Sequence, residues 1–296
     1  MQARLFHLQA LSALHCGTGQ SVGVVDLPIA RARATRLPLV PGSSIRGVLR
    51  EELTPKRDGD GRDAEVVADL FGPKAIVENE KAFAGALAIG DAHLLCLPVR
   101  ALAGVLCYVT SPFILARYAH DLGMTGRGLP AGLPTPASSS DALVAEGSVN
   151  LMGSTLVLED LDLTAGQNAD TTAWAKCIAE QVYAADSTAQ ADLIARFAIV
   201  PDDVLSYLSE TATELRARIA IDDRTGVVRK GALWYEENLP AETILWGVYA
   251  LAGSMNTESK KRRTAEELAR LLPADGRLLQ LGGKAGVGRG LVRLYI

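Results

Sequence analysis

The chain has 296 residues, 48% of them hydrophobic and 22% charged, so it can bury a sizeable core and is too apolar to be disordered. It contains no apolar run long enough to span a bilayer, and its N-terminus lacks the pattern of a signal peptide. The four cysteines show neither metal-ligand spacing nor a disulfide framework. We therefore expect a cytoplasmic, reduced protein without structural zinc.

The charges are unevenly distributed along the chain. The net charge of −4 argues against a uniformly basic nucleic-acid binder. However, residues 27–50 contain five arginines and no acid, and residues 276–296 contain four cations and no acid. Such segregation allows a locally basic surface that can bind nucleic acid. Chance clustering on a solvated face is the alternative.

The first half of the chain predicts strands and helices in mixed order. Alternating apolar residues predict a strand over residues 4–14. Residues 41–55 predict a helix whose N-cap lies within residues 41–44, and residues 56–65 predict an exposed loop. Two further strands, a helix and a long insertion rich in Gly, Pro and Ser are predicted at residues 87–97, 104–110, 112–122 and 125–149.

The second half continues this mixture. A strand, two helices and the start of a third helix are predicted at residues 156–163, 172–185, 188–198 and 202–203. Three strands are predicted at residues 216–221, 232–236 and 242–251, with a turn at residues 222–226. A capping box at residues 264–267 opens a short helix, and the last six residues alternate like a strand. The fold class is therefore α+β with mainly antiparallel strands.

The run Gly282-Gly283-Lys284-Ala285-Gly286-Val287-Gly288-Arg289-Gly290 is the most informative stretch of the chain. Its glycines let a backbone approach a bulky anion closely, and Lys284 and Arg289 add positive charge. Dinucleotide and P-loop sites need a helix after the glycines, whereas a strand-like segment follows here. The pattern therefore indicates a bound phosphate backbone outside the familiar nucleotide-binding folds.

The predicted helix at residues 41–55 breaks a rule of helix electrostatics. Helix N-termini favour acids, but this one carries Arg46 in its first turn and Arg50 one turn later. With the hydroxyls of Ser43 and Ser44, these cations would make a phosphate clamp. The alternative is a solvated surface helix whose arginines pair with acids elsewhere.

Residues 15–29 form a glycine-rich segment with a single acid, Asp26. A carboxylate on such a loop can ligate a metal ion or position a reacting hydroxyl, although most loop aspartates only cap turns. His15 can move protons or can hydrogen-bond its own loop. Further on, Trp234 and Tyr235 lie beside cations, which suits stacking on unpaired bases. Ordinary packing is the alternative for these two aromatic side chains.

Taken together, these motifs resemble a known family. The matching stretches, in chain order, are residues 14–20 with 23–29, residues 38–47, residues 90–95 with 98–100, residues 221–226 with 230–237, and the terminal glycine run. They look like the repeated backbone subunit of the Cmr complex, the type III-B CRISPR effector, within the RAMP superfamily of guide-RNA-binding proteins.

The resemblance implies an RRM-like (ferredoxin-like) core with an antiparallel sheet and large insertions, including a thumb hairpin. Residues 1–296 would form a single domain, with insertions at about 54–86, 125–155 and 165–240. Copies of the chain would assemble as a helical filament on CRISPR RNA, with other Cmr subunits, and cleave complementary target RNA at regular intervals. The implied activity is that of a divalent-metal-dependent endoribonuclease, with Mg²⁺ or Mn²⁺ as the cofactor.

The resemblance also implies functional residues. It maps the family's catalytic aspartate onto Asp26, which we expect to bind the metal or to orient the target's 2′-OH for in-line attack, with His15, Tyr235 or Glu236 assisting. The residues expected to hold RNA are Ser43, Ser44, Arg46, Arg50, Gly282, Gly283, Lys284, Gly286, Gly288 and Arg289.

Three alternatives remain open from the sequence. The chain could be a non-catalytic RNA-binding scaffold, the equivalent backbone subunit of a Csm complex, or an unrelated enzyme whose glycine run holds nucleotide phosphates.

Overall fold

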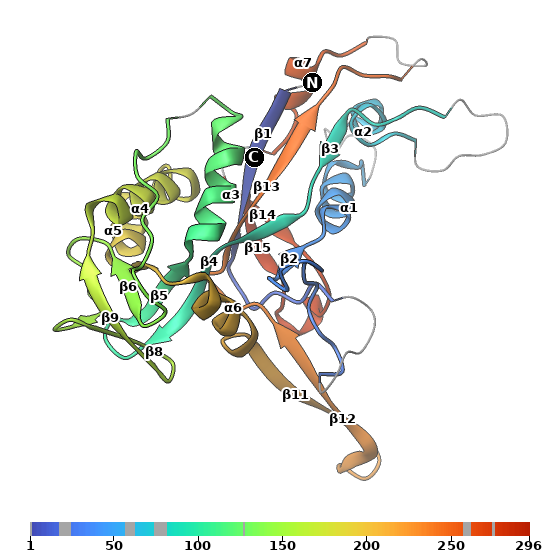
Figure 1. Ribbon diagram of the computed structural model, residues 1–296. Coiled ribbons are helices and arrows are strands. Elements are labelled where there is room, and N and C mark those ends of the chain that lie inside the picture. Colours follow the sequence, from blue (N-terminus) through green and yellow to red (C-terminus); the bar gives the residue numbers. More distant parts are fainter. Residues whose placement is uncertain are drawn as a thin grey trace.

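The computed structural model describes residues 2–17, 25–56, 63–73, 82–126, 128–256, 262–273 and 276–296. These residues form a 13-stranded sheet, helices on both of its faces, and a separate two-stranded hairpin (Figure 1). The expected α+β class is confirmed, and most strand pairs are antiparallel. Within the described part of the chain, no helix is long and apolar enough to cross a membrane.

The elements have the following bounds. The strands of the large sheet are β1 (Gln2–Ala10), β2 (Leu39–Val40), β3 (Leu87–Ile89), β4 (Ala92–Ala101), β5 (Val105–Thr110), β6 (Asp141–Val144), β7 (Leu151–Met152), β8 (Thr155–Leu158), β9 (Leu161–Gln167), β10 (Phe197–Ile199), β13 (Ile244–Leu251), β14 (Arg277–Gln280) and β15 (Leu291–Tyr295). The helices are α1 (Gly42–Leu53), α2 (Ala64–Phe71), α3 (Pro112–Gly123), α4 (Ala169–Val182), α5 (Ser187–Ala195), α6 (Asp202–Thr211) and α7 (Ala265–Ala269). The hairpin consists of β11 (Glu214–Ile221) and β12 (Val228–Asn238).

The middle of the sheet is an antiparallel set in the spatial order β15-β1-β13-β4. In the sequence, α1 lies between β1 and β4, and α7 lies between β13 and β15. Strand side chains alternate between faces, so Phe6 and Leu8 of β1 are fully buried in one apolar cluster with Ile45 and Leu49 of α1. A second apolar cluster, which includes residues of α3 and α4, covers part of the opposite face.

The other end of the sheet closes on itself. The strands β4, β5, β10, β6, β9 and β8 follow one another, and β8 pairs back with β4 where Leu158 lies opposite Ala101. A six-stranded ring results, in which β5–β10 and β6–β9 are parallel pairs. Figure 1 shows this ring at the left with α4 and α5, while α1, α2 and α7 lie on the other side of the central strands.

Several predicted boundaries are wrong, each for a local reason. Residues 156–163 are two strands instead of one, because the chain turns at Glu159, which has a φ of 51°, while the apolar alternation continues through the turn. The predicted insertion at residues 125–149 contains β6, a strand of the ring. The predicted helix at residues 188–198 ends at Ala195, and β10 follows it.

Two predictions near α1 also need correction. The predicted helix at residues 41–55 spans Gly42–Leu53, and its N-cap is Pro41, which makes no side-chain capping bond. Residues 57–62 of the predicted loop lie outside the described residues. The end of that loop instead starts α2, where the Asp63 carboxylate accepts a hydrogen bond from the Glu65 amide. The short run of apolar residues in α2 was too weak a signal to predict this helix.

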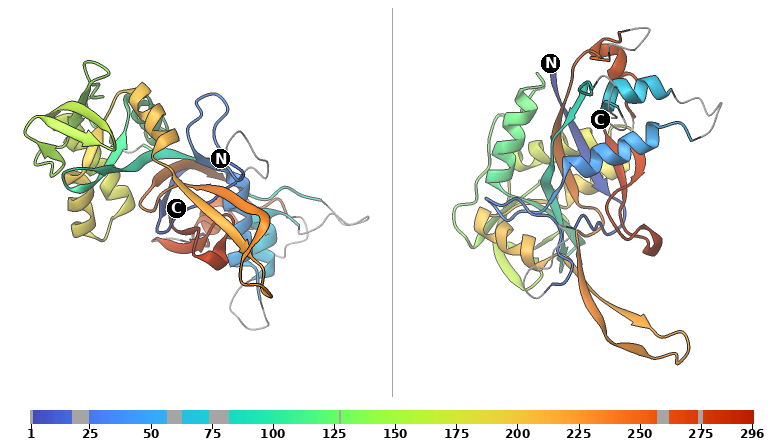
Figure 2. Two further views of the ribbon diagram at one scale, coloured as in Figure 1. Left: turned by 90° about the horizontal axis from the view of Figure 1, so that it is seen from below. Right: turned by 90° about the vertical axis from the view of Figure 1, so that its right-hand side faces the viewer.

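The β11–β12 hairpin projects away from the rest of the molecule (Figure 2). Its turn is confirmed at residues 222–226, where the Asp222 carboxylate accepts hydrogen bonds from the amides of Arg224 and Thr225. Ile219 and Leu233 lie opposite each other across the hairpin and are 50% and 56% exposed. A two-stranded hairpin is marginally stable alone. A partner that covers its exposed apolar side chains would stabilise it.

Candidate active site

One edge of β12 organises the candidate site. The other edge of β12 pairs with β11, whereas on this edge the backbone groups of Tyr235 and Glu237 form hydrogen bonds with the loops. The Leu27 amide donates to the Tyr235 carbonyl (3.1 Å), and the Glu237 amide donates to the Leu27 carbonyl (3.0 Å). Residues 25–29 thus run beside β12 like an added parallel strand. Leu14 pairs with the next position along this edge.

Asp26 is exposed on this added strand. Its Oδ2 accepts a hydrogen bond from the backbone amide of Tyr235 at 2.8 Å. One carboxylate oxygen is therefore anchored to β12 while the side chain stays accessible. A carboxylate held in this way can orient an incoming hydroxyl or share a cation with a bound phosphate.

His15 is fixed two residues further along the same edge. Its Nδ1 lies 2.7 Å from the carbonyl oxygen of Glu237, and only 6% of the residue is exposed. A carbonyl can only accept, so Nδ1 carries a proton, and Nε2 is the ring nitrogen that this bond does not use. A Cβ on Gly17 would lie 2.8 Å from that Nε2, so glycine at this position leaves room beside it.

Tyr235 and Glu236 differ sharply in exposure, as alternating strand residues do. Tyr235 is 44% exposed, whereas Glu236 is completely buried. The Glu236 carboxylate lies between two cations, with Oε1 3.5 Å from Nε of Arg289 and Oε2 3.7 Å from Nε of Arg218. Neither oxygen has a hydrogen-bond partner in the described part of the chain. Glu236 therefore links the glycine run to the hairpin electrostatically instead of facing solvent.

The glycine run lies between β14 and β15 and packs against the segment that carries His15. The predicted strand after the run is confirmed as β15, and the loop contains one 3₁₀ turn, η1 (Ala285–Val287). The Gly283 amide donates to the His15 carbonyl at 2.9 Å. At Gly282 φ is 73°, and a Cβ would lie 2.2 Å from the same carbonyl oxygen, so only glycine fits there.

The four predicted RNA-binding residues of α1 lie in a different environment. Ser43 is exposed, and Ser44 is half-buried. The Arg46 guanidinium donates to the Phe71 carbonyl (2.7 Å), and the Arg50 guanidinium donates to the Gly72 carbonyl (3.1 Å), so both arginines bind the C-terminal end of α2. Burial and the nearby charge of Arg46 lower the pKa of Arg50. These contacts use some of the guanidinium donors that the predicted clamp would offer to phosphate.

Whether this site can bind a divalent cation depends on the carboxylates that it contains. Among the residues with described structure, no group of three or more His, Cys, Asp or Glu side chains could hold a metal ion. Asp26 offers one carboxylate, and Mg²⁺ commonly binds one or two protein carboxylates and takes its other ligands from phosphates and water. The residues therefore fit a cation shared with RNA and do not fit a closed protein cage.

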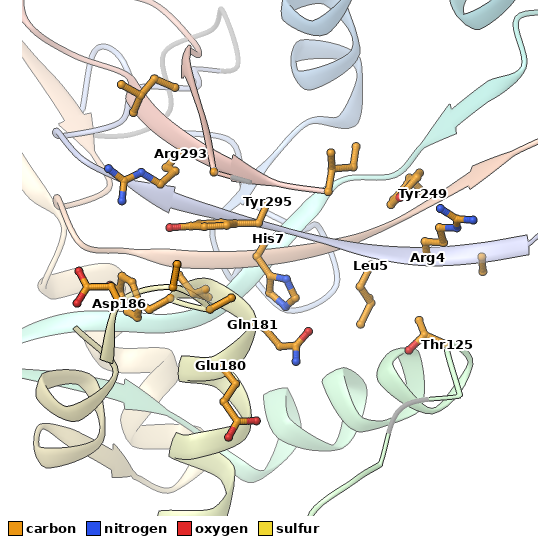
Figure 3. Close-up of a pocket in the computed structure, with 18 of the residues that line it drawn as sticks. Arg4, Leu5, His7, Thr125, Glu180, Gln181, Asp186, Tyr249, Arg293 and Tyr295 are labelled. Carbon is orange, nitrogen blue, oxygen red and sulfur yellow. The ribbon is translucent and has the colours of Figure 1, made fainter. Parts of the chain in front are cut away.

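A groove of about 1240 Å³ lies between the sheet and the helical layer (Figure 3). Arg293 and Tyr295 of β15 and His7 of β1 line its floor, and Glu180 and Asp186 lie on the facing wall. None of the residues that the sequence predicts as functional lines this groove. The site at the edge of β12 is therefore separate from the groove.

Sequence reasoning missed two charged residues of this site. Arg31 counts toward the basic stretch in the sequence, but its side chain is only 9% exposed and is paired with Glu237. Glu237 ends the matching stretch at residues 230–237 but was assigned no function there, yet its backbone and side chain touch both candidate loops. An acid at position 237 fits the exposed position that strand alternation predicts after Tyr235 and Glu236, so the sequence carries no signal that Glu237 is buried.

The comparisons with known proteins decide the family. The model of the RAMP superfamily matches residues 7–293. This chain belongs to the RAMP superfamily. It is 34% identical over 298 aligned residues to the CRISPR system Cmr endoribonuclease Cmr4 of Pyrococcus furiosus, an alignment that covers 100% of this chain and 96% of the relative.

Other RAMP relatives agree with this assignment. The crystal structure of oligomeric Cmr4 from Pyrococcus furiosus has a TM-score of 0.73 at 27% identity and covers 100% of this chain and 97% of its own. A cryo-EM structure of the type III-B Cmr-beta complex bound to cognate target RNA contains the same fold, with a TM-score of 0.73 at 22% identity. The match covers 100% of this chain and 97% of that chain. The match to Csm3 of Enterococcus italicus, 35% identical, covers only 22% of this chain and 35% of Csm3. The resemblance to the Cmr backbone subunit is confirmed and is favoured over the Csm alternative.

Proposed function

We propose that this chain is the guide-RNA-binding backbone subunit of a type III CRISPR effector. It assembles as a helical filament on CRISPR RNA with other Cmr subunits and cleaves complementary target RNA at regular intervals. The observation that carries the proposal is the exposed Asp26 carboxylate, anchored on β12 beside the glycine run, in a chain related to Cmr4 over its full length. Support for assembly and RNA contact comes from relatives described as oligomeric and as bound to target RNA.

The fold proposal follows the order of the central strands. The order β15-β1-β13-β4, with α1 and α7 as the connecting helices, has the strand–helix–strand repeat of an RRM-like (ferredoxin-like) core. The hairpin and the strands that close the ring with β4, namely β5, β6, β8, β9 and β10, are then insertions into this core. The β11–β12 hairpin is the thumb, because it projects from the molecule and exposes apolar side chains that could enter between bases.

Cleavage proceeds by attack of the target's own 2′-OH on the adjacent phosphorus. Asp26 orients the hydroxyl, and the lone pair on His15 Nε2 accepts its proton. The bond from phosphorus to the 5′-oxygen breaks, and the exposed Tyr235 hydroxyl donates a proton to that leaving oxygen. The products are a 2′,3′-cyclic phosphate and a 5′-hydroxyl. A divalent cation, Mg²⁺ or Mn²⁺, shared between Asp26 and the RNA would neutralise phosphate charge.

The glycine run and α1 hold the guide strand. The run from Gly282 to Gly288 is exposed except at the half-buried Lys284, and it presents backbone amides and the Lys284 ammonium to phosphates. The Arg289 side chain, 12% exposed and paired with Glu236, adds positive charge behind the run. Ser43 and Ser44, in the first turn of α1, add hydroxyl donors beside Arg46 and Arg50. Glu236 supports this surface by pairing with Arg289.

A reconstituted complex with guide and labelled target tests the proposal. The wild-type complex should cut the target and leave a 5′-hydroxyl on the downstream fragment, and EDTA should suppress cutting. Asp26→Ala should abolish cutting while assembly and guide binding persist. A 5′-phosphate on the downstream fragment would exclude 2′-OH attack. A wild-type complex that binds the target without cutting it would favour the non-catalytic scaffold.

A further inference from the structure

A largely buried ion pair joins the segment that follows Asp26 to β12. Nη2 of Arg31 is 2.6 Å from Oε1 of Glu237, and the two side chains are only 9% and 8% exposed. Charges this far from water are costly unless they are paired and hydrogen-bonded, so a pair at this position is held in one geometry by its surroundings.

Glu237 contacts both candidate catalytic loops through separate atoms. Its Oε2 accepts a hydrogen bond from the Ile29 amide (3.1 Å), three residues after Asp26. Its own amide donates to the Leu27 carbonyl, and its carbonyl accepts from Nδ1 of His15 (2.7 Å). The positions of both Asp26 and His15 therefore depend on this one residue of β12.

Arg31 connects the same loop to the base of the hairpin. Its guanidinium donates to the carbonyl of Ser209 (2.9 Å), in the last turn of α6, and to the carbonyl of Arg36 (2.9 Å). The chain leaves α6 and enters β11 at Glu214. The Thr213 hydroxyl, at that junction, donates to Oε1 of Glu237 (3.2 Å). The Asp26 loop and both strands of the hairpin thus meet at one buried pair.

We propose that Arg31 and Glu237 are positioning residues that fix Asp26 and His15 relative to the hairpin. This inference rests on the proposed function, because it concerns the rate and position of RNA cleavage. The hairpin and the Asp26 loop move as one body, so the phosphate that is cut lies at a set distance from the hairpin. A loosened pair allows neighbouring phosphates to reach Asp26 and reduces the population of the reactive geometry.

Four variants of increasing severity test this role in the reconstituted complex. Thr213→Val removes one hydrogen bond to Glu237, Arg31→Lys keeps the charge, and Glu237→Gln and Arg31→Met break the ion pair. The readouts are the single-turnover cleavage rate at saturating complex, the affinity for target RNA, and the cut positions at nucleotide resolution. Arg100→Met is the control, because Arg100 forms an exposed pair with Glu159 on the ring.

Glu237→Gln and Arg31→Met should slow cleavage by about 10-fold to 100-fold, the effect of a misplacement of about 1 Å, and should spread cutting to neighbouring phosphates. Target affinity should stay within about twofold of wild type, because the pair contacts no RNA in this account. Arg31→Lys should cleave faster than Arg31→Met, and Thr213→Val should lose less of the rate than Glu237→Gln. Arg100→Met should match wild type.

Two results would overturn the inference while the proposed function stands. One is a wild-type rate and cut pattern in Glu237→Gln and Arg31→Met complexes. The other is a rate loss matched by an equal loss of target affinity with unchanged cut positions, which marks a general structural role. If Arg31→Met fails to fold, the cleavage rate and cut positions of Thr213→Val and Arg31→Lys are compared with wild type instead. Unshifted cutting in both contradicts the inference. A wild-type complex that does not cleave overturns the proposed function, and this inference with it.

Discussion

At the scale of single residues, the site depends on where glycine is placed around His15. The Gly283 amide binds the His15 carbonyl, Gly17 leaves space beside Nε2, and Gly282 approaches the same carbonyl with a positive φ. Sequence reasoning assigned the terminal glycines to RNA contact. The structure adds that Gly282 is also required by packing against the segment that carries His15, whereas no atom of the described residues lies within 4 Å of a Cβ placed at Gly286.

This difference gives a paired prediction on stability. Gly282→Ala should destabilise the chain by about 1–3 kcal/mol, because the residue has a φ of 73° and its Cβ would meet the His15 carbonyl oxygen. Gly286→Ala should change the free energy of unfolding by less than about 0.5 kcal/mol, since a Cβ there enters open space. Denaturant unfolding of the two variants checks this, and equal stabilities would contradict the packing described for Gly282.

At the scale of elements, the central strands and most helices could be predicted from the sequence because their apolar periodicity is strong. The strand at β1 and the capping box before α7 are examples, and Thr264 and Glu267 do make the reciprocal bonds of such a box. The closure of the six-stranded ring could not be predicted, because it depends on the pairing of Ala101 with Leu158, far apart in the sequence. The residues alone identified Asp26 as a candidate but left turn capping open, because one loop carboxylate has no distinctive spacing, and only the family resemblance assigned it to catalysis.

The hairpin allows a prediction about assembly. Ile219→Ser should leave the free energy of unfolding within about 0.5 kcal/mol of wild type, since the side chain is exposed, but should weaken filament formation or target cleavage. Leu102→Ser is the control, because Leu102 is 69% exposed on a turn of the ring. Particle length on guide RNA and the target cleavage rate are the measurements. An Ile219→Ser complex with wild-type length and rate would show that the apolar face of the hairpin has no partner.

At the scale of the whole molecule, a net charge of −4 is compatible with RNA binding because the cations are grouped. Not all of them are available, however. The Arg31 side chain is largely buried against Glu237, and Arg46 and Arg50 bind the end of α2. The sequence could predict the grouping of charge but not which arginines are used inside the fold, since that depends on tertiary contacts.

Salt dependence measures which cations reach the RNA. Lys284→Gln should reduce the slope of log affinity for guide RNA against log salt by about 1, because one phosphate contact is lost. Lys176→Gln, at an exposed lysine of α4, should leave the slope unchanged. Equal slopes for the two variants would remove Lys284 from the RNA-binding surface.

The most direct test of the central claim is target cleavage by a complex containing Asp26→Asn. Asparagine keeps an oxygen that can accept the Tyr235 amide, so the loop stays anchored while the carboxylate charge is lost. We predict a complex that assembles, binds guide and target as wild type does, and does not cut, while Asp162→Asn, at an exposed aspartate of the ring, cuts normally. Cutting at the wild-type rate by the Asp26→Asn complex would contradict the account.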